Sequence, residues 1–214
     1  MKELAKKYLD LIKGSYQGLN LTRILDEEEF YLKQIQDSLI PFEESVQVIA
    51  LAEKLQMIDV GFGGGFPALP LSKKFPNKKI IGFDSRAKKV VAVSEIAKLL
   101  GLNNLKVFHN RIEEIEIDRD SLITFKAVGK IKDMLKLINI NAKNQAYVVF
   151  YKGPSLATEE QGFEHVPGWK LLEDFSLQLG ENQRRILLYS NVPRGTASKK
   201  IVKSLVKVSS LNLE

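Results

Sequence analysis

The chain has 214 residues, of which 44% are hydrophobic and 27% charged, and its formal net charge is +6. This is the composition of a globular protein, and the length suits one domain with a substantial core. Cysteine is absent, which excludes disulfides, thiolate metal sites and covalent catalysis through a thiol. His109 and His165 are the only histidines, so we expect no metal site and no histidine-dependent catalytic triad. No apolar run is long enough to span a bilayer, and we expect a cytoplasmic monomer without membrane contact.

The first 50 residues have the pattern of helices. Apolar side chains recur at helical spacing from Leu4 to Ile12, which predicts one buried helical face. A second helix is predicted to begin near Asp26, because Asp26 and Glu29 have the spacing of a capping box. We therefore expect residues 1–50 to form an N-terminal helical cap packed on the main domain.

Residues 51–214 alternate short apolar runs with amphipathic helices, which predicts a parallel sheet covered by helices on both faces. The predicted strands cover residues 55–60, 78–84, 105–109, 121–127, 146–151, 169–178 and 184–190. A helix is predicted over residues 86–100, capped by Ser85 and ended by Gly101. The last two strands are joined by residues 179–183, which include glycine and asparagine and predict an antiparallel hairpin. The expected fold is α/β, with a seven-stranded, mostly parallel sheet that ends in this hairpin.

The sequence DVGFGGGFPALPL, residues 59–71, places four glycines directly after a predicted strand. Such a loop suits a dinucleotide or S-adenosylmethionine, or it is a tight turn that holds no ligand. The dinucleotide motif G-x-G-x-x-G starts with Gly61 and Gly63 but fails at Phe66, where the third glycine should stand. Asp59 would repel a diphosphate and attract the sulfonium and ammonium groups of S-adenosylmethionine. On this argument the loop favours S-adenosylmethionine.

An acidic residue also ends the next predicted strand. Asp84 stands 23 residues after Gly61, close to the position at which a carboxylate accepts hydrogen bonds from ribose hydroxyls in both ligand classes. It therefore supports an adenosine-containing ligand without choosing between the two.

Basic residues are concentrated in two segments. Residues 182–213 contain seven basic residues and no acidic one, and residues 73–89 contain seven basic residues and one acidic one. Such clusters are typical of proteins that bind phosphate backbones, and a solvated surface can have the same pattern. Charge alone therefore leaves both interpretations open.

Seven motifs follow one another in the order found in a known family. They are LNLT (residues 19–22), QIQDS (34–38), DVGFGGGFPALPL (59–71), FDSRAKKV (83–90), NRIEE (110–114), YKG (151–153) and VPRGT (192–196). From about Leu19 onward the chain thereby resembles the ribosomal RNA small subunit methyltransferase G family, also called glucose-inhibited division protein B. Pro67 and Pro70 in the glycine loop make this match more specific than a glycine loop alone.

The resemblance implies a class I methyltransferase with a Rossmann-like fold that uses S-adenosylmethionine. It implies as substrate the N7 atom of a guanine in the decoding-region loop of 16S rRNA, in the RNA itself or in the small ribosomal subunit. No catalytic residue is expected, because N7 carries a lone pair and no proton, so that positioning of the reactants can suffice. The residues expected to hold the cofactor are Gly61, Gly63, Gly65, Phe66, Asp84, Ser85, Ile112, Glu113 and Lys126. Those expected to contact the substrate RNA, a hypothesis that rests on charge clustering, are Arg194, Lys199, Lys200 and Lys203.

Three positions or segments depart from the family pattern. Lys126 stands where the family has an arginine, and Gln34 where it has a histidine. Lysine keeps the charge but loses the planar fork of arginine, and we expect Lys126 near the cofactor or the target base. Residues 88–93 replace a K-R-x-x-F-L pattern. Glu113, in its acidic surroundings, could instead be the solvated start of a helix.

Three other functions stay open at this point. The chain could be a class I methyltransferase with a small molecule or a protein as acceptor. It could be a non-catalytic RNA-binding relative that lost activity through its departures from the family pattern. A nicotinamide-dependent oxidoreductase fits least, since the third glycine of the dinucleotide motif and an evident proton-transfer histidine are both missing.

Overall fold

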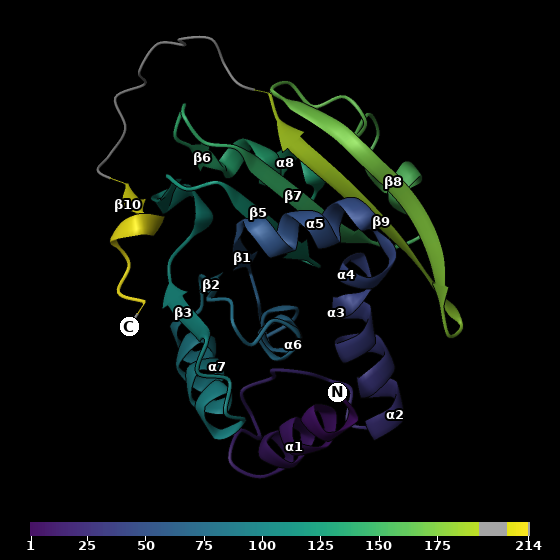
Figure 1. Cartoon of the computed structure of the whole chain (residues 1–214). Coiled ribbons are helices and arrows are strands. Elements are labelled where there is room, and N and C mark those ends of the chain that lie inside the picture. Colours follow the sequence, from purple (N-terminus) through teal and green to yellow (C-terminus); the bar gives the residue numbers. More distant parts are fainter. Residues whose placement is uncertain (193–204, 214) are drawn as a thin grey trace.

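A seven-stranded sheet runs through the centre of the molecule (Figure 1), in the order β3-β2-β1-β5-β7-β9-β8. The computed structural model describes residues 1–192 and 205–213. The seven strands are β1 (Gln56–Val60), β2 (Ile80–Asp84), β3 (Leu105–His109), β5 (Ser121–Lys126), β7 (Ala146–Lys152), β8 (Trp169–Leu179) and β9 (Asn182–Asn191). Strands β3, β2, β1, β5 and β7 are parallel, and β9 pairs antiparallel with β7 and β8. The predicted α/β fold is confirmed.

Helices and loops cover both faces of this sheet and enclose an apolar core on each. The helices after β1 are α6 (Ala68–Lys74), α7 (Ala87–Leu99), α8 (Ile131–Leu137) and α9 (Leu156–Glu159), with the short 3-10 helices η2 (Ile112–Glu114) and η3 (Val208–Ser210). Because side chains alternate along a strand, Met57 packs in the first core with α6 and α7, and Ile58 packs in the second with α8 and α9.

The chain before β1 is helical. It forms α1 (Lys2–Lys13), α2 (Glu27–Phe30), the π-helical segment η1 (Tyr31–Gln36), α3 (Asp37–Leu39), α4 (Pro41–Glu44) and α5 (Val46–Lys54). Asp26 caps α2 by accepting a hydrogen bond from the Glu29 backbone N–H at 2.8 Å. The Glu29 side chain pairs with Lys33 at 2.6 Å instead, so only half of the predicted capping box forms. These helices share the first apolar core with the sheet.

A second, smaller sheet is absent from the sequence-based prediction. It consists of β10 (Val206–Lys207), β4 (Ile115–Ile117) and β6 (Asn139–Ile140), all parallel. Strand β4 lies between the predicted strands 105–109 and 121–127, where no strand was predicted. Its alternation of buried isoleucines with a glutamate is nevertheless the period of a half-buried strand.

Two details of the prediction are wrong. The hairpin link is only two residues long, because Leu179 already pairs with Asn182 across it, and Gly180 provides the positive φ of +60° that a tight turn needs. Ser85 does not cap α7: the N-cap is Arg86, whose backbone N–H donates to the Asp84 carboxylate instead.

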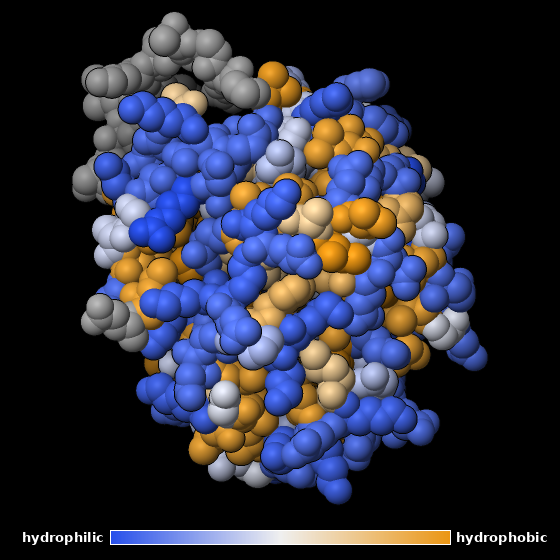
Figure 2. Space-filling view, in the orientation of Figure 1, coloured by the Kyte–Doolittle hydropathy of each residue, from blue (hydrophilic) through white to orange (hydrophobic). Residues whose placement is uncertain are grey.

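The surface shown in Figure 2 is mostly hydrophilic, with apolar side chains interspersed among polar ones. The large apolar residues that are exposed come from separate segments: Leu25, Val46, Val91, Leu99, Val192 and Val206. Isolated apolar side chains on a surface are common in proteins. Within residues 1–192 and 205–213, no helix is both long and apolar enough to cross a bilayer.

Candidate active site

The glycine loop connects the carboxyl end of β1 to α6. Gly61, Gly63 and Gly65 have φ values of +72°, +57° and +96°, in the range that side chains other than glycine adopt rarely. A Cβ atom on Gly61 would lie 2.7 Å from Val128, and one on Gly65 would lie 2.4 Å from Leu69. A Cβ atom on Gly63 would meet nothing closer than 3.8 Å. Two of the glycines thus allow close packing, and Gly63 is the one that faces open space.

The N-terminal helices pack against this loop. The Tyr8 hydroxyl on α1 donates a hydrogen bond to the Gly64 carbonyl oxygen at 2.7 Å. The Tyr8 ring stacks on Phe30 with centroids 5.1 Å apart and meets the edge of Phe66 at 5.2 Å. The loop conformation therefore depends on α1 as well as on its own glycines.

Asp84 joins the glycine loop to the loop that follows β2. One carboxylate oxygen accepts a hydrogen bond from the Gly63 backbone N–H at 2.9 Å, and the other accepts from the Arg86 backbone N–H at 2.8 Å. Each carboxylate oxygen can accept a further hydrogen bond. Asp84 can therefore hold the loop and still accept hydrogen bonds from a ligand.

A cavity of about 740 Å³ opens between the glycine loop, the ends of β2, β5 and β7, and the η1–α3 segment. Of the residues predicted to hold the cofactor, those that line it are Gly61, Gly63, Phe66, Asp84, Ser85 and Lys126. The three others do not line it. Gly65 packs on Leu69, Ile112 is buried in the second core, and the exposed Glu113 lies 3.8 Å from the Arg111 guanidinium.

Asp59 does not face the cavity, contrary to our electrostatic argument. It is fully buried, and its carboxylate accepts hydrogen bonds from the Ala68 backbone N–H and the Thr124 hydroxyl, both at 2.9 Å. Burial raises the pKa of Asp59 to about 7. The cavity itself is lined by more cations than carboxylates: Lys33, Arg86, Lys89, Lys126, Lys152 and Arg184 against Asp37 and Asp84. Local charge therefore gives no reason to prefer a cationic cofactor.

A charge cluster that we did not predict forms one wall of this cavity. The Asp37 carboxylate lies 2.6 Å from Nε of Arg184 and 3.2 Å from Nζ of Lys126. Lys126 also donates a hydrogen bond to the Gln34 side-chain oxygen at 3.0 Å. The two single-residue departures from the family pattern, Gln34 and Lys126, are thus direct neighbours. Asp37 belongs to the quoted motif QIQDS and Arg184 to the basic segment, but neither pattern indicates that they meet.

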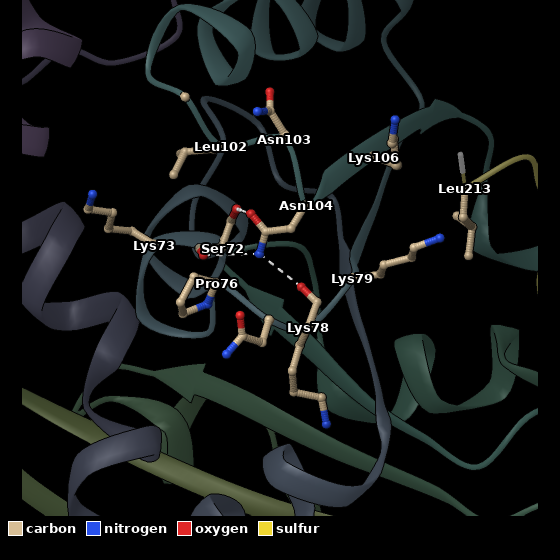
Figure 3. A pocket seen from close by; sticks show the side chains of 12 residues that line it. Ser72, Lys73, Pro76, Lys78, Lys79, Leu102, Asn103, Asn104, Lys106 and Leu213 are labelled. Atoms are coloured by element: carbon tan, nitrogen blue, oxygen red, sulfur yellow. Dashed lines mark hydrogen bonds between the residues drawn. The ribbon is translucent and has the colours of Figure 1, made fainter.

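The first cavity lies at the edge of the sheet where the parallel strands end. A second cavity, of about 600 Å³ (Figure 3), lies at the opposite edge, where strands β2 and β3 begin. Its lining includes Lys73, Lys78, Lys79 and Lys106. Figure 3 shows the Asn104 side chain between Ser72 and Lys78, where its amide group donates to the carbonyl oxygens of both at 3.1 and 2.8 Å. None of the residues predicted to bind a ligand lies here. The predicted basic segment 73–89 is therefore divided, with Arg86 and Lys89 alone at the first cavity.

The residues predicted to contact RNA, namely Arg194, Lys199, Lys200 and Lys203, lie outside the described residues. Among residues 1–192 and 205–213, no group of three or more His, Cys, Asp or Glu side chains could hold a metal ion.

A family model described as GidB, rRNA small subunit methyltransferase G, matches residues 1–187 of the chain. The chain belongs to the rRNA small subunit methyltransferase G family. The Ribosomal RNA small subunit methyltransferase G of Lactobacillus helveticus (strain DPC 4571) is 31% identical over 207 residues, which cover 92% of this chain and 85% of that protein. The protein of the same name from Alkaliphilus metalliredigens (strain QYMF) is 32% identical over 215 residues, which cover 92% and 88%.

Solved structures with the same fold are much more distant in sequence. A putative methyltransferase, yhhF from Escherichia coli, has a TM-score of 0.53 at 11% identity and covers 73% of this chain and 86% of its own. A mutant of MtNAS in complex with S-adenosylmethionine has a TM-score of 0.57 at 11% identity, with 89% and 73% covered. At this identity the likeness concerns the fold only.

Membership of the rRNA small subunit methyltransferase G family confirms the predicted enzyme class, a methyltransferase that acts on rRNA of the small subunit. It also supports S-adenosylmethionine as the methyl donor of this class I fold. The target atom and the residues that bind each ligand stay predictions.

Proposed function

We propose that the protein transfers a methyl group from S-adenosylmethionine to N7 of a guanine in the decoding-region loop of 16S rRNA, with the cavity at the glycine loop as its active site. The observation that carries the proposal is the joint presence there of Gly63, which leaves open space, and of the Asp84 carboxylate. Gly63 lets a ligand approach the backbone, and Asp84 suits the two ribose hydroxyls of an adenosine. The volume of about 740 Å³ is ordinary for a small-molecule site.

The chemistry asks little of the protein beyond orientation. Gly63 and Asp84 would hold S-adenosylmethionine, which would supply a methyl group on a positively charged sulfur. As the in-plane lone pair of guanine N7 forms the new N–C bond, the S–C bond would break, the electron pair would stay on sulfur as a neutral thioether, and the positive charge would pass to the guanine. No proton has to leave N7, so no general base is needed. Tyr151, at the cavity, is not a candidate base, since its hydroxyl donates to the Ser38 carbonyl oxygen at 2.7 Å and burial raises its pKa. The protein therefore accelerates the reaction by holding the two reacting atoms in line.

The substrate RNA has to expose the target base. N7 lies on the major-groove edge, which is deep and narrow in A-form RNA, so an unpaired or flipped guanine is required. Arg86 and Lys89 line the cavity and form no ion pair within the described ranges 1–192 and 205–213. They are available for phosphates beside the target base, together with the four C-terminal cations that we predicted. We infer that the protein works where ribosomes are assembled, in the cytoplasm, as a monomer.

The test is mass mapping of modified guanines in 16S rRNA from strains with and without this gene product. We expect one N7-methylguanine to disappear when the gene is deleted and to return when it is restored. Unchanged 16S rRNA would refute the proposed substrate. Calorimetry with S-adenosylmethionine then distinguishes the remaining alternatives, because a methyltransferase with another acceptor binds it and a non-catalytic RNA-binding relative does not.

A further inference from the structure

The charge cluster in the cavity wall contains one acceptor without a well-directed hydrogen bond. The Asp37 side chain is only 1% exposed, and Oδ1 is bound to Arg184. Oδ2 is buried and has no hydrogen bond within the described part of the chain, although Lys126 Nζ lies 3.2 Å away. A buried carboxylate oxygen left in this way is costly.

Lys126 lies close to the glycine loop. It ends β5, which pairs with β1, so its backbone is next to the start of that loop. Its Nζ atom is 5.9 Å from the centre of the Phe66 ring. One of its three N–H groups donates to Gln34. The ammonium also lies 3.2 Å from Asp37 Oδ2, without a directed hydrogen bond, and its contact with the Lys33 carbonyl oxygen is 3.5 Å long. That distance is at the limit of a hydrogen bond, so one N–H remains available to a ligand.

The target base of the proposed reaction presents a matching acceptor. On guanine, O6 and N7 are neighbouring acceptors on the same edge. A donor that binds O6 therefore places N7 beside itself. Adenine carries an amino group in the position of O6, and this group would face the ammonium with a second donor.

We propose that Lys126 donates a hydrogen bond to O6 of the target guanine and thereby selects guanine over adenine, and that Asp37 is the positioning residue that holds Lys126 in place. This inference rests on the proposed function, since it assumes that a guanine enters this cavity. The proposal assigns the choice between guanine and adenine to the cavity wall that also contains Gln34 and Arg184.

Asp37 also acts on the charge of Lys126. Burial lowers the pKa of Lys126, and the nearby Arg184 lowers it further, whereas the Asp37 carboxylate and, more weakly, Asp59 raise it. Removal of the Asp37 charge should therefore shift the loss of the ammonium proton to lower pH. The charged ammonium is a stronger donor to O6 than the neutral amine, so the alkaline limb of the pH profile reports on Asp37.

The test uses small ribosomal subunits reconstituted with 16S rRNA that carries guanine, inosine or 2-aminopurine at the methylated position. Inosine keeps both O6 and N7, and 2-aminopurine keeps N7 but lacks O6. For the wild-type protein we expect similar kcat/KM for guanine and inosine, and a value on the order of 10- to 100-fold lower for 2-aminopurine. Lys126→Met should lower kcat/KM for guanine and for inosine to the value for 2-aminopurine. Lys126→Gln, which keeps a donor, should retain part of the preference.

The control is Lys74→Met, which removes another partly buried, ion-paired lysine, 2.8 Å from Glu43 and outside the cavity. This variant should have the wild-type kcat/KM for guanine, inosine and 2-aminopurine. If Lys126→Met preferred guanine over 2-aminopurine by the wild-type factor, the inference would be wrong while the proposed function stood. If the wild-type protein methylated no guanine, the proposed function itself would fail.

Asp37→Asn separates positioning from general stability. We expect it to move the alkaline limb of the guanine reaction to lower pH and to leave the pH profile of the 2-aminopurine reaction unchanged. An equal loss on both bases, with no change in either pH profile, would show that Asp37 is merely structural.

Discussion

Asp59 shows how neighbours along the chain can mislead about a site. It stands two positions before Gly61, and we therefore expected its charge at the ligand. Side chains on a strand alternate between the two faces, and Asp59 points under the first turn of α6, where it binds Ala68 and Thr124. Asp84, by contrast, ends its strand and lines the cavity. The sequence reveals which strand carries a carboxylate, but the direction of the side chain depends on the packing of the next helix.

The burial of Asp59 has a measurable effect on stability. Its pKa is about 7 in the folded protein against an ordinary value of 3.8, so between these values the folded state binds more protons than the unfolded state. The contribution of Asp59 to stability is therefore fully present below about pH 4 and is lost as the pH rises through about 7, which amounts to roughly 4 kcal/mol in all.

Asp59→Asn should remove this dependence. Its amide can accept from the Ala68 N–H and donate to the Thr124 hydroxyl, so both contacts can survive. We expect the variant to be more stable than the wild type at pH 8 and to lose most of this advantage at pH 5, as measured by urea unfolding at both pH values. A stability difference that is independent of pH would contradict a raised pKa at this position.

Among the secondary-structure elements, those with strong periodic patterns were predictable and those made by pairing across the fold were not. The seven strands of the main sheet, the helical start of the chain and Gly101 as the left-handed end of α7, with φ +70°, were recognised from local patterns. The small sheet was not, because β4 and β10 have only three and two residues and lie far apart in the chain. The contact between Asp37 and Arg184 joins residues 147 positions apart, and it requires the order of the strands in the sheet.

Helix α1 is expected to contribute to the active site through Tyr8. Tyr8→Phe leaves the buried Gly64 carbonyl oxygen without its donor, and we expect it to lower the free energy of unfolding by about 1–2 kcal/mol. It should also weaken the binding of S-adenosylmethionine, since Gly64 belongs to the glycine loop. The measurements are urea unfolding and calorimetry.

Tyr16→Phe is the matched control for this prediction. It removes the same hydroxyl group from an exposed hydrogen bond to Glu95 at 3.0 Å, and we expect a change of about 0.5 kcal/mol or less and no effect on the cofactor. If both variants bound S-adenosylmethionine like the wild type, α1 would have no role in shaping the loop.

At the scale of the molecule, the basic residues of segment 73–89 are divided between the two edges of the sheet. Arg86 and Lys89 lie at the cavity with the glycine loop, and Lys73 and Lys79 lie at the second cavity. If RNA approaches the first edge, only the first pair should release counterions on binding. Comparing the two pairs therefore tests which edge of the sheet faces the RNA.

Replacement of Arg86 and Lys89 by alanine should reduce the slope of log affinity against log salt by roughly 1 to 2. The corresponding double alanine variant of Lys73 and Lys79 should leave the slope unchanged. The measurement is filter binding of 16S rRNA at several salt concentrations. Equal losses in the two variants would mean that the RNA does not distinguish the two edges.

The most direct test is to locate the methyl group itself. Small subunits from a strain that lacks the protein are incubated with the protein and S-adenosylmethionine, and their 16S rRNA is then cleaved chemically at N7-methylguanine. We expect one cleavage site with the wild type and none with Gly63→Val. The control is Gly101→Val: Gly101 also has a positive φ, of +70°, but lies outside the glycine loop, so this variant should give the same cleavage site as the wild type. No cleavage with the wild type, or full cleavage with a folded Gly63→Val variant, would contradict methyl transfer to guanine N7 from this cavity.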